Sequence, residues 1–372
     1  ELGSLAANRE PLAVNREGIP HTDYGIRITD YGLRNTAHRS PLTDYAVLTF
    51  TLVATLSLLF TARLDVASNE WRVIILEPAL FYLMLRQLRL SREEMWVILD
   101  AFVLGGVTVA GYGLWQVAFD RTALITAEGG LLRLKSVFGS PNNVGLYLGR
   151  ILPLLAATML LGQGMEARRR WAYTAAILPV GLALLLSFSK GALFLGMPAA
   201  LLFVGAVWLK RNGRSPWPWL LAIILGGLSI ILVAQQIPAL AGRLDLTGAT
   251  GVFRLNLWQA SINMFREHPL FGVGLDNFLY AYRGRYILDA AWQEPNLNHP
   301  HNILLDFATR LGLLGLLSGG WLLWQLGSTL KQAWATADAA WQPVIVGFSG
   351  AFIAMLAHGL VDHSFFLVDL AF

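Results

Sequence analysis

The sequence predicts an all-α integral membrane protein: a polytopic helical bundle of about nine spans with a helical subdomain in one extracytoplasmic loop. Its 372 residues are 55% hydrophobic and only 14% charged, whereas a soluble domain carries about 25% charged residues. The apolar residues also gather in runs of about 20, the length that a helix needs to cross the hydrocarbon core. No cysteine is present, which excludes a disulfide framework and a cysteine metal site.

Nine apolar runs are the candidate spans. They cover residues 44–62, 71–87, 95–117, 143–162, 171–188, 190–209, 217–236, 301–327 and 341–361. The joins after the second, fourth, sixth and eighth runs carry Arg and Lys, and all four fall on one side of the membrane. The positive-inside rule therefore places the N-terminal side of the chain in the cytoplasm and the last end outside.

This topology divides the chain into four parts. Residues 1–43 are polar and irregular and are interpreted as a disordered cytoplasmic linker. Residues 44–236 hold the first seven spans, residues 237–300 form a long extracytoplasmic loop, and residues 301–372 hold the last two spans. Apolar spacing within the loop predicts a helix over residues 250–269. Both ends of the sequence are expected to be edges of a fragment.

His301 lies where the long outer loop re-enters the membrane, in the sequence NHPHN ahead of an apolar helix. We expect it to cap that helix or to lie in its first turn. A neutral imidazole on the outer face is what a general base needs. Asn302 beside it is a candidate substrate ligand. The alternative is a histidine that only caps a membrane helix at the interface.

Basic residues on the outer segments are candidates for binding phosphate. Arg254 opens the predicted loop helix, and Arg283 and Arg285 lie in the sequence YRGRY. An Arg fork holds phosphate oxygens bidentately. Lys190 lies at an outer turn beside two serines. The alternatives are pairing of each Arg with a loop acid or with the lipid surface, and interfacial snorkelling of the Lys.

Polar residues also begin the fourth span. Ser140 is a candidate N-cap, and Pro141 and Asn142 fit the first helical positions. Asn142 and its neighbour Asn143 are candidate ligands for sugar hydroxyls, with a purely structural role as the alternative.

The last span ends in HGLVDHSFF, on the same outer side as His301. His358, Asp362 and His363, together with His299, have the residue types of a His/carboxylate metal site. We expect instead that they support the site without metal, with Asp362 orienting a histidine by a hydrogen bond.

Four ionisable residues lie within predicted spans, where such groups are costly and usually paired. Glu77 and Arg150 lie at similar depth and are a candidate pair. Asp306 and Arg310 are spaced i,i+4 and are expected to pair on one helix. Alternatively, the four residues line a path through a transporter.

Four segments of the chain resemble one family. The pattern HN-x9-G-xx-G starting at His301 resembles the signature of bacterial O-antigen ligases and the related O-antigen polymerases. FRLNLWQASINMFREHPLFGVGLDNF resembles the Arg…Trp…HP-x-x-G-x-G-x-x-N-F block that precedes the histidine in that family. SVFGSPNNVGLYL and SFSKGALFLG resemble two further segments. Together they cover roughly residues 130–372.

The resemblance implies a membrane glycosyltransferase of the C-type fold class in the bacterial inner membrane, with its site on the extracytoplasmic face. It would transfer a glycan from undecaprenyl pyrophosphate to a lipid, glycan or protein acceptor, without metal or other cofactor. His301 would be the base and Arg254 would hold the pyrophosphate. Lys190 stands where the family usually has Arg, which weakens bidentate phosphate binding there.

The competing hypothesis is a polytopic transporter of a small anion or a glycolipid. A transporter predicts weak internal symmetry between two halves, and no such symmetry is visible in the sequence. Membrane lipids are expected partners under both hypotheses, and nucleic acid is not.

Overall fold

The structure is a computed structural model that describes residues 41–127, 130–236 and 249–367. The predicted linker over residues 1–43 lies outside the described residues except at its end, where helix α1 already begins at Pro41. The same holds for residues 237–248 at the start of the predicted outer loop.

The described chain is almost entirely helical. Its α-helices are α1 (Pro41–Ser57), α2 (Leu64–Glu70), α3 (Glu77–Gln87), α4 (Arg92–Phe119), α5 (Pro141–Leu161), α6 (Ala167–Leu186), α7 (Met197–Arg211), α8 (Trp217–Gln235), α10 (Ala249–Glu267), α11 (Phe278–Ala281), α12 (Ile303–Thr336) and α13 (Gln342–Gly359). Short 3-10 turns cover Leu58–Phe60, Arg121–Ala123, Gly162–Gly164 and Asp289–Ala291, and π-helical turns cover Trp71–Leu76, Ala192–Gly196 and Tyr282–Tyr286. Strands β1 (Ile125–Thr126) and β2 (Leu132–Arg133) form a small antiparallel hairpin.

Each of the nine predicted runs coincides with a helix. Six helical segments among the described residues are long and apolar enough to cross a membrane: Pro41–Phe60, Arg92–Phe119, Pro141–Gly164, Ala192–Arg211, Ile303–Thr336 and Gln342–Gly359. The predicted class, a polytopic all-α membrane protein, is therefore confirmed. The count of nine spans remains a prediction, because the helix over residues 71–87 carries three charged side chains and α6 begins with three arginines.

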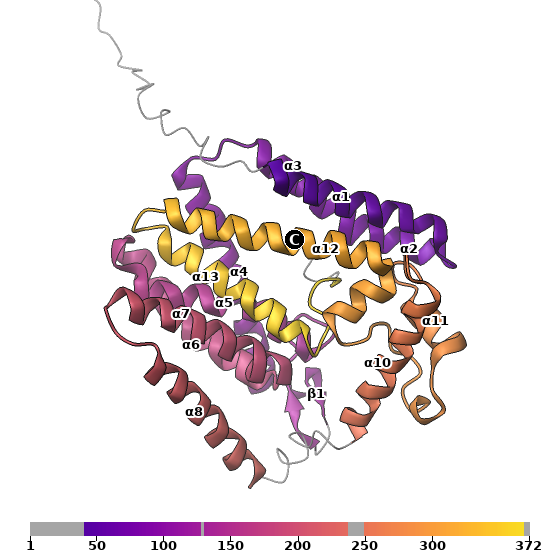
Figure 1. Cartoon of the computed structure of the whole chain (residues 1–372). Coiled ribbons are helices and arrows are strands. Elements are labelled where there is room, and N and C mark those ends of the chain that lie inside the picture. The colour runs from indigo at the N-terminus through magenta and orange to yellow at the C-terminus, as the bar shows by residue number, and fades with distance from the viewer. Residues whose placement is uncertain (1–40, 128–129, 237–248, 368–372) are drawn as a thin grey trace, which may run out of the picture. The chain divides into compact units, whose positions relative to one another are not determined.

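Helix α5 is the centre of the bundle and packs against α6, α7 and α13 (Figure 1). In the most apolar 18-residue stretch of this helix, 72% of the residues are buried. This share is larger than in any other candidate span of the described chain. The side chain of Ser140 accepts a hydrogen bond from the Asn142 backbone N–H at 3.2 Å, and Pro141 occupies the first turn. The predicted start of this helix is thus confirmed, and it fixes Asn142 in the first turn of the most buried candidate span of the described chain.

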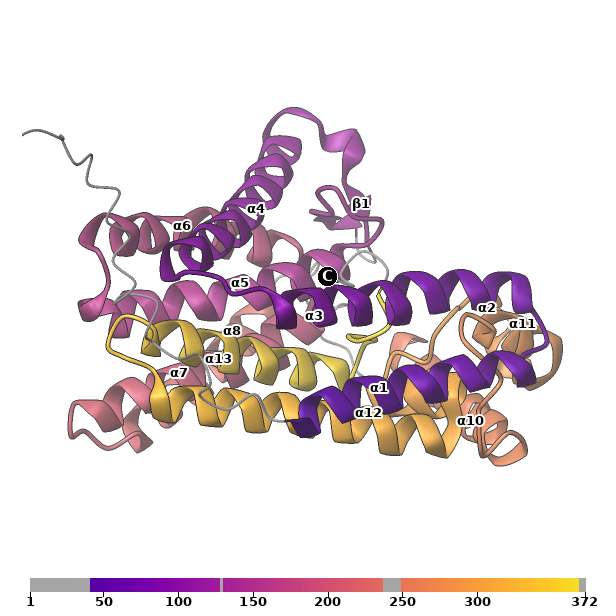
Figure 2. The ribbon, with the colours of Figure 1, turned by 90° about the horizontal axis from the view of Figure 1, so that it is seen from above.

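A second layer pairs helices from opposite ends of the sequence. Helix α1 lies along α12 in both views (Figures 1 and 2). Phe50 of α1 contacts Phe307 of α12 and Phe365 beyond α13, with ring centroids 5.9 and 5.7 Å apart. These aromatic contacts bury apolar area that neither helix could bury alone. They anchor the outer end of α12, which follows directly after His301.

Helix α12 is broken at Gly312, where φ is 65° and ψ is −157°. A Cβ at this position would lie 2.3 Å from the carbonyl carbon of Leu270. Glycine is therefore required twice, for the left-handed φ and for the close approach of another backbone.

The segment that approaches is the loop that follows α10. The Leu313 backbone N–H donates to the carbonyl of Pro269 at 2.7 Å, and the Val273 N–H donates to the carbonyl of Thr309, also at 2.7 Å. The loop thus satisfies backbone groups that the break in α12 leaves unpaired. The HP-x-x-G-x-G block and Gly312, which follows Asn302 after nine intervening residues, are two sides of one backbone contact.

The described part of the outer loop has its own apolar cluster. Helix α10 covers nearly the whole predicted helix 250–269 and ends just before Pro269. Leu257 and Met264 on α10 are fully buried against Phe278 and Tyr282 of the following segment. This cluster gives the loop a fixed shape beside the outer end of α12.

Candidate active site

A polar pocket of about 330 Å³ lies between the start of α5, the start of α12 and the end of α13, on the side that the predicted topology places outside. His301 and Asn142 line it, so the structure brings together two of the residues that the sequence predicted for the site. The pocket is lined by Asn69, Glu70, Gly139, Ser140, Asn142, Asn143, Asp276, Asn298, His299, His301, Arg310, Asp362, His363, Phe366 and Leu367. The lining comes from the end of α2, the start of α5, the loops before α11 and α12, α12 itself and the segment after α13.

The centre of the pocket is a hydrogen-bonded pair of His301 and Asp362. His301 Nδ1 lies 2.8 Å from Asp362 Oδ1, as the sequence predicted for a histidine and this carboxylate. The Asp362 side chain is 4% exposed, whereas that of His301 is 21% exposed. A carboxylate that accepts from Nδ1–H holds the ring in the tautomer with a lone pair on Nε2. His301 Nε2 has no hydrogen-bond partner among the described residues and is available as a base.

A neighbouring histidine supports the same tautomer. His299 Nδ1 lies 2.6 Å from Asn298 Oδ1, and His299 Nε2 lies 3.2 Å from His301 Nδ1. Burial, and then the adjacent His363, hold the pKa of His299 well below its usual value, so the ring is neutral. It donates from Nδ1 to the amide oxygen, and its Nε2 lone pair faces the proton on His301 Nδ1. Two acceptors therefore fix that proton.

Asp362 is held by three donors. Besides His301, the Asn142 amide donates to Oδ2 at 2.8 Å and the His363 backbone N–H donates to Oδ1 at 2.9 Å. Burial would raise the pKa of Asp362, but the hydrogen bond from His301 and the nearby His358 ring, whose Nε2 is 3.8 Å from Oδ2, hold it well below its usual value. The carboxylate is thus ionised at neutral pH and can stabilise an imidazolium on His301.

Backbone strain marks the pocket. His301 has φ 52° and Asp276 has φ 49°, both in the left-handed region that costs a non-glycine residue about 1 kcal/mol or more. Such conformations persist where the surroundings impose them, and they cluster at functional sites. His301 precedes the N-cap of α12, which corrects the prediction that it caps the helix or lies in its first turn.

The N-cap of α12 is Asn302. Its Oδ1 accepts from the Leu304 and Leu305 backbone N–H groups at 3.0 and 3.1 Å, and its Nδ2 donates to the Leu360 carbonyl at 2.9 Å. The amide is thus engaged with backbone on both sides. This contact ties the start of α12 to the turn after α13, and so ties His301 to Asp362.

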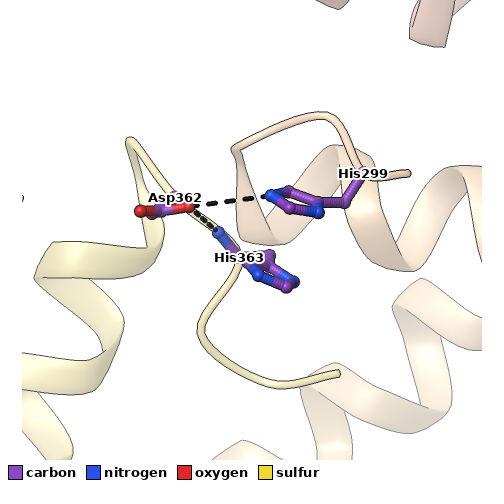
Figure 3. A group of neighbouring side chains, drawn as sticks. All are labelled: His299, Asp362 and His363. Atoms are coloured by element: carbon purple, nitrogen blue, oxygen red, sulfur yellow. Dashed lines mark hydrogen bonds and ion pairs between the residues drawn. The ribbon is translucent and has the colours of Figure 1, made fainter. Parts of the chain in front are cut away.

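His299, Asp362 and His363 form a group in which one ligand atom from each lies within 4.8 Å of the others (Figure 3). The two imidazole rings are stacked, with centroids 3.4 Å apart and planes 10° apart. A zinc ion lies about 2.0–2.1 Å from its imidazole ligands, close to the plane of each ring. Parallel stacked rings do not meet this requirement, so one ring must turn before the group fits a metal.

The floor of the pocket is a buried charge cluster around Arg310. Its guanidinium donates to Asp306 at 2.7 Å and is paired with Glu70, so the predicted Asp306–Arg310 pair is confirmed. Burial raises the pKa of Glu70 to about 7, against the lowering effect of Arg310. The predicted Glu77–Arg150 pair is wrong. Glu77 pairs instead with Arg72, at 2.6 Å.

Arg254 lies on α10, outside the lining of the pocket, and is partly buried. It forms no ion pair among the residues that the structure describes. One turn later, the Trp258 indole N–H donates to the Pro300 carbonyl at 3.0 Å. Because four residues of an α-helix rise about 6 Å, Arg254 lies about one turn along α10 from the point where this helix contacts the loop that carries His301.

Lys190 also lies next to the site without lining it. A Cβ on Gly145 of α5 would lie 2.7 Å from Ser189 Cβ, and a Cβ on Gly191 would lie 2.2 Å from His358 Cδ2. The two neighbours of Lys190 thus contact α5 and the His358 ring, whose Nε2 is 3.8 Å from Asp362 Oδ2. The glycine of the SKG sequence is required because the imidazole occupies the place of a side chain.

Arg283 and Arg285 lie away from the pocket. Arg285 pairs with Glu267 at 2.6 Å, and Arg283 lies 3.4 Å from Asn296 Oδ1. Neither residue is among those that line the pocket. The first pair is the contact with a loop acid that the sequence left open as an alternative.

Two acidic lining residues, Glu70 and Asp276, were not predicted from the sequence. Glu70 ends the short outer segment after α1, and Asp276 stands in GLDNF directly after the glycine block. The sequence did contain a signal for Glu70. It is an acid next to the boundary of a predicted span, and Arg310 within another predicted span needs an acidic partner. Asp276 lies inside the block that resembles the family.

Comparison of the sequence with known protein families gives one match. The model of a family described as O-antigen ligase matches residues 174–318. The match contains α7, α10, His301 and the break in α12, so it confirms the resemblance drawn from the sequence. No curated protein matches the chain.

Proposed function

We propose that this chain, a member of the O-antigen ligase family, transfers a glycan from undecaprenyl pyrophosphate to an acceptor hydroxyl. We place the reaction on the extracytoplasmic face of the bacterial inner membrane. The observation that carries the proposal is the His301–Asp362 hydrogen bond of 2.8 Å in a pocket at the outer ends of the central helices. It supplies an imidazole base with a carboxylate partner for the charge that develops on it.

The proposed step is a direct displacement at the anomeric carbon. His301 Nε2 takes the proton of the acceptor hydroxyl as its oxygen attacks that carbon. The bond from the anomeric carbon to the phosphate oxygen breaks, and undecaprenyl pyrophosphate leaves with the electron pair. The configuration is inverted. Asp362 stabilises the imidazolium that forms, and the protein contributes mainly position and charge, since pyrophosphate is already a good leaving group.

The charges of the lining favour the acceptor as the occupant of the pocket. Three lining residues are acids (Glu70, Asp276 and Asp362), Arg310 is the one Lys or Arg in the lining, and two of the three histidines are neutral. Such a lining repels a pyrophosphate. The amides of Asn69, Asn142, Asn143 and Asn298 in the same lining match sugar hydroxyls, which both donate and accept hydrogen bonds.

We place the pyrophosphate at the rim, where basic residues flank the pocket. Arg254 stands one turn from the residue that contacts the His301 loop, and a guanidinium can hold phosphate bidentately. Lys190 lies between residues that contact α5 and His358 and supplies a second positive charge. Because Arg285 is already paired with Glu267, we assign Arg283 and Arg285 a weaker part in donor binding.

The proposed reaction uses no metal. The stacked rings of His299 and His363 do not offer their lone pairs to a common ion, and both residues support the proton arrangement around His301. We therefore assign them a positioning role. Transfer that is unchanged by a chelator supports this assignment, and loss of transfer that added zinc restores contradicts it.

The test is in vitro transfer from a lipid-pyrophosphate glycan donor by the purified chain. We expect His301→Ala to abolish transfer and Arg254→Ala to raise the apparent KM for the donor. Arg266→Ala is the matched control, because Arg266 is an exposed arginine on the same helix. Full activity of folded His301→Ala protein would refute the mechanism.

The same experiment separates the transporter hypothesis. That hypothesis needs ionisable residues along a path, but Arg310 and Asp306 are paired with each other and Glu77 is paired with Arg72. Transfer in detergent, where no gradient exists, supports the enzyme. Glycolipid movement across proteoliposomes without any transfer product would favour the transporter.

A further inference from the structure

A second cavity, of about 710 Å³, lies at the opposite ends of the same helices. It is an open groove between the ends of α5, α7 and α12 and the start of α13, and its lining includes Leu161, Phe203, Trp334 and Val346. This volume is within the ~300–1,000 Å³ range of ligand pockets. Nothing in the proposed transfer reaction uses it.

The groove and the active site lie on opposite sides of the membrane. Helix α5 lines the active site at Asn142 and the groove at Leu161. A rise of 1.5 Å per residue separates these positions by about 28 Å, close to the ~30 Å thickness of the hydrocarbon core. The groove therefore opens at the headgroup level of the other leaflet, the cytoplasmic one by the positive-inside rule.

The mouth of the groove is basic, although its walls are apolar. Lys210 and Arg211 end α7 at the mouth and are exposed. Neither forms an ion pair with an acid in the described part of the chain. The Arg211 guanidinium is held by the neutral amide of Gln342 on α13, at 2.8 Å. Two positive charges thus lie at the rim without neutralisation, and that of Arg211 is held in place.

We propose that this groove binds an anionic phospholipid of the cytoplasmic leaflet. One acyl chain lies between the apolar walls, and the headgroup phosphate is bound by Lys210 and Arg211. Basic pockets between membrane helices on the cytoplasmic side are a recurrent way to bind anionic headgroups. Trp334 in the groove wall and Trp217 beside the mouth are residues typical of the interface, which sets the mouth at headgroup depth.

The test is lipid retention measured by native mass spectrometry on the purified chain. The probes are phosphatidylglycerol and phosphatidylcholine with identical acyl chains. We expect wild-type protein to retain phosphatidylglycerol preferentially. The double variant Lys210→Ala/Arg211→Ala should lose about 30-fold in apparent affinity for it, because each basic side chain near an anionic headgroup contributes roughly fivefold. Ala206→Phe should weaken retention of both lipids while the charges stay, since Ala206 lines the groove.

The matched control is Arg89→Ala/Arg168→Ala. It removes two exposed arginines that the predicted topology places on the same side, and neither lines the groove. This variant should retain phosphatidylglycerol like the wild type. Equal retention of the two lipids by wild type, or equal loss in the control and in the Lys210/Arg211 variant, would show only general attraction to the surface and overturn the proposal. Unchanged retention in Ala206→Phe would overturn the placement of the chain.

Discussion

Replacing Asp362 with Asn removes one negative charge and leaves the side chain nearly isosteric. Asp362 Oδ1 accepts from His301 and from the His363 backbone, and Oδ2 accepts from the Asn142 amide. An Asn at this place must turn its NH2 group toward one of these donors. Asn142 has no free rotation to compensate, because its own Oδ1 accepts from Arg133 at 2.8 Å. At least one hydrogen bond is therefore lost whichever way the new amide lies.

The bond to His301 is charge-assisted, and such bonds contribute about 1.5–3 kcal/mol. At roughly 1.4 kcal/mol per tenfold in rate, Asp362→Asn should lower the rate of transfer by between about 10-fold and 100-fold. The fall should appear in kcat, with the donor KM nearly unchanged, because Asp362 acts through His301.

The assay is steady-state transfer in detergent, alongside thermal unfolding of each variant. Asp338→Asn is the control, since Asp338 forms a half-exposed pair with Arg92 after α12, at the end far from the site. If folded Asp362→Asn protein turns over within about twofold of wild type, the carboxylate does not support the base and the proposed mechanism is wrong.

Three further outcomes are expected. Gly312→Ala should lower the free energy of unfolding by about 2 kcal/mol or more, because its φ is 65° and the new Cβ would lie 2.3 Å from the Leu270 carbonyl carbon; Gly320→Ala, with open space around it, should be nearly neutral in the same thermal unfolding assay. Burial lowers the pKa of His363 to about 4. Between pH 4 and about 6.5 the unfolded chain therefore binds more protons than the folded one, and the free energy of unfolding should fall as the pH falls through this window. His363→Gln should flatten that slope and His268→Gln, at an exposed site, should not; equal slopes in all three proteins would contradict the assignment. Asn302→Ala should lower the free energy of unfolding by about 1 kcal/mol or more, because it removes the N-cap oxygen and the hydrogen bond to the Leu360 carbonyl. Asn302→Asp keeps the cap oxygen and removes only the second bond, so it should lose less stability by the same assay, and equal losses would show that the cap is not the cause.

Hydropathy predicted the helices because the length and composition of a span follow from the membrane alone. All nine runs became helices, and the N-cap of α5 followed from its local sequence. The break in α12 did not follow. Gly312 has a left-handed φ because a loop forty residues earlier packs its backbone there, and this contact is tertiary.

The same distinction explains the site. The predicted topology placed the start of one span and the end of the next on the same side of the membrane. The similar depth of these two ends predicted that Asp362 lies near His301. The Glu77–Arg150 pairing failed because depth is only one coordinate, and rotation about each helix axis is set by packing. Glu70 pairs with Arg310 across 240 residues. Both charges are visible in the sequence, but nothing in it indicates that the two helices face each other at these positions.

The backbone contact between the loop after α10 and the break in α12 limits how this chain can be recombined with a similar one. Exchange of the loop alone is an obvious design, but residues 268–274 and 309–314 share hydrogen bonds that no side chain can replace. In a chimera that takes one of these segments from each parent, the backbone hydrogen bonds between them would be mismatched, in the helix that begins just after His301. The two segments, separated along the chain, therefore form a single module for engineering.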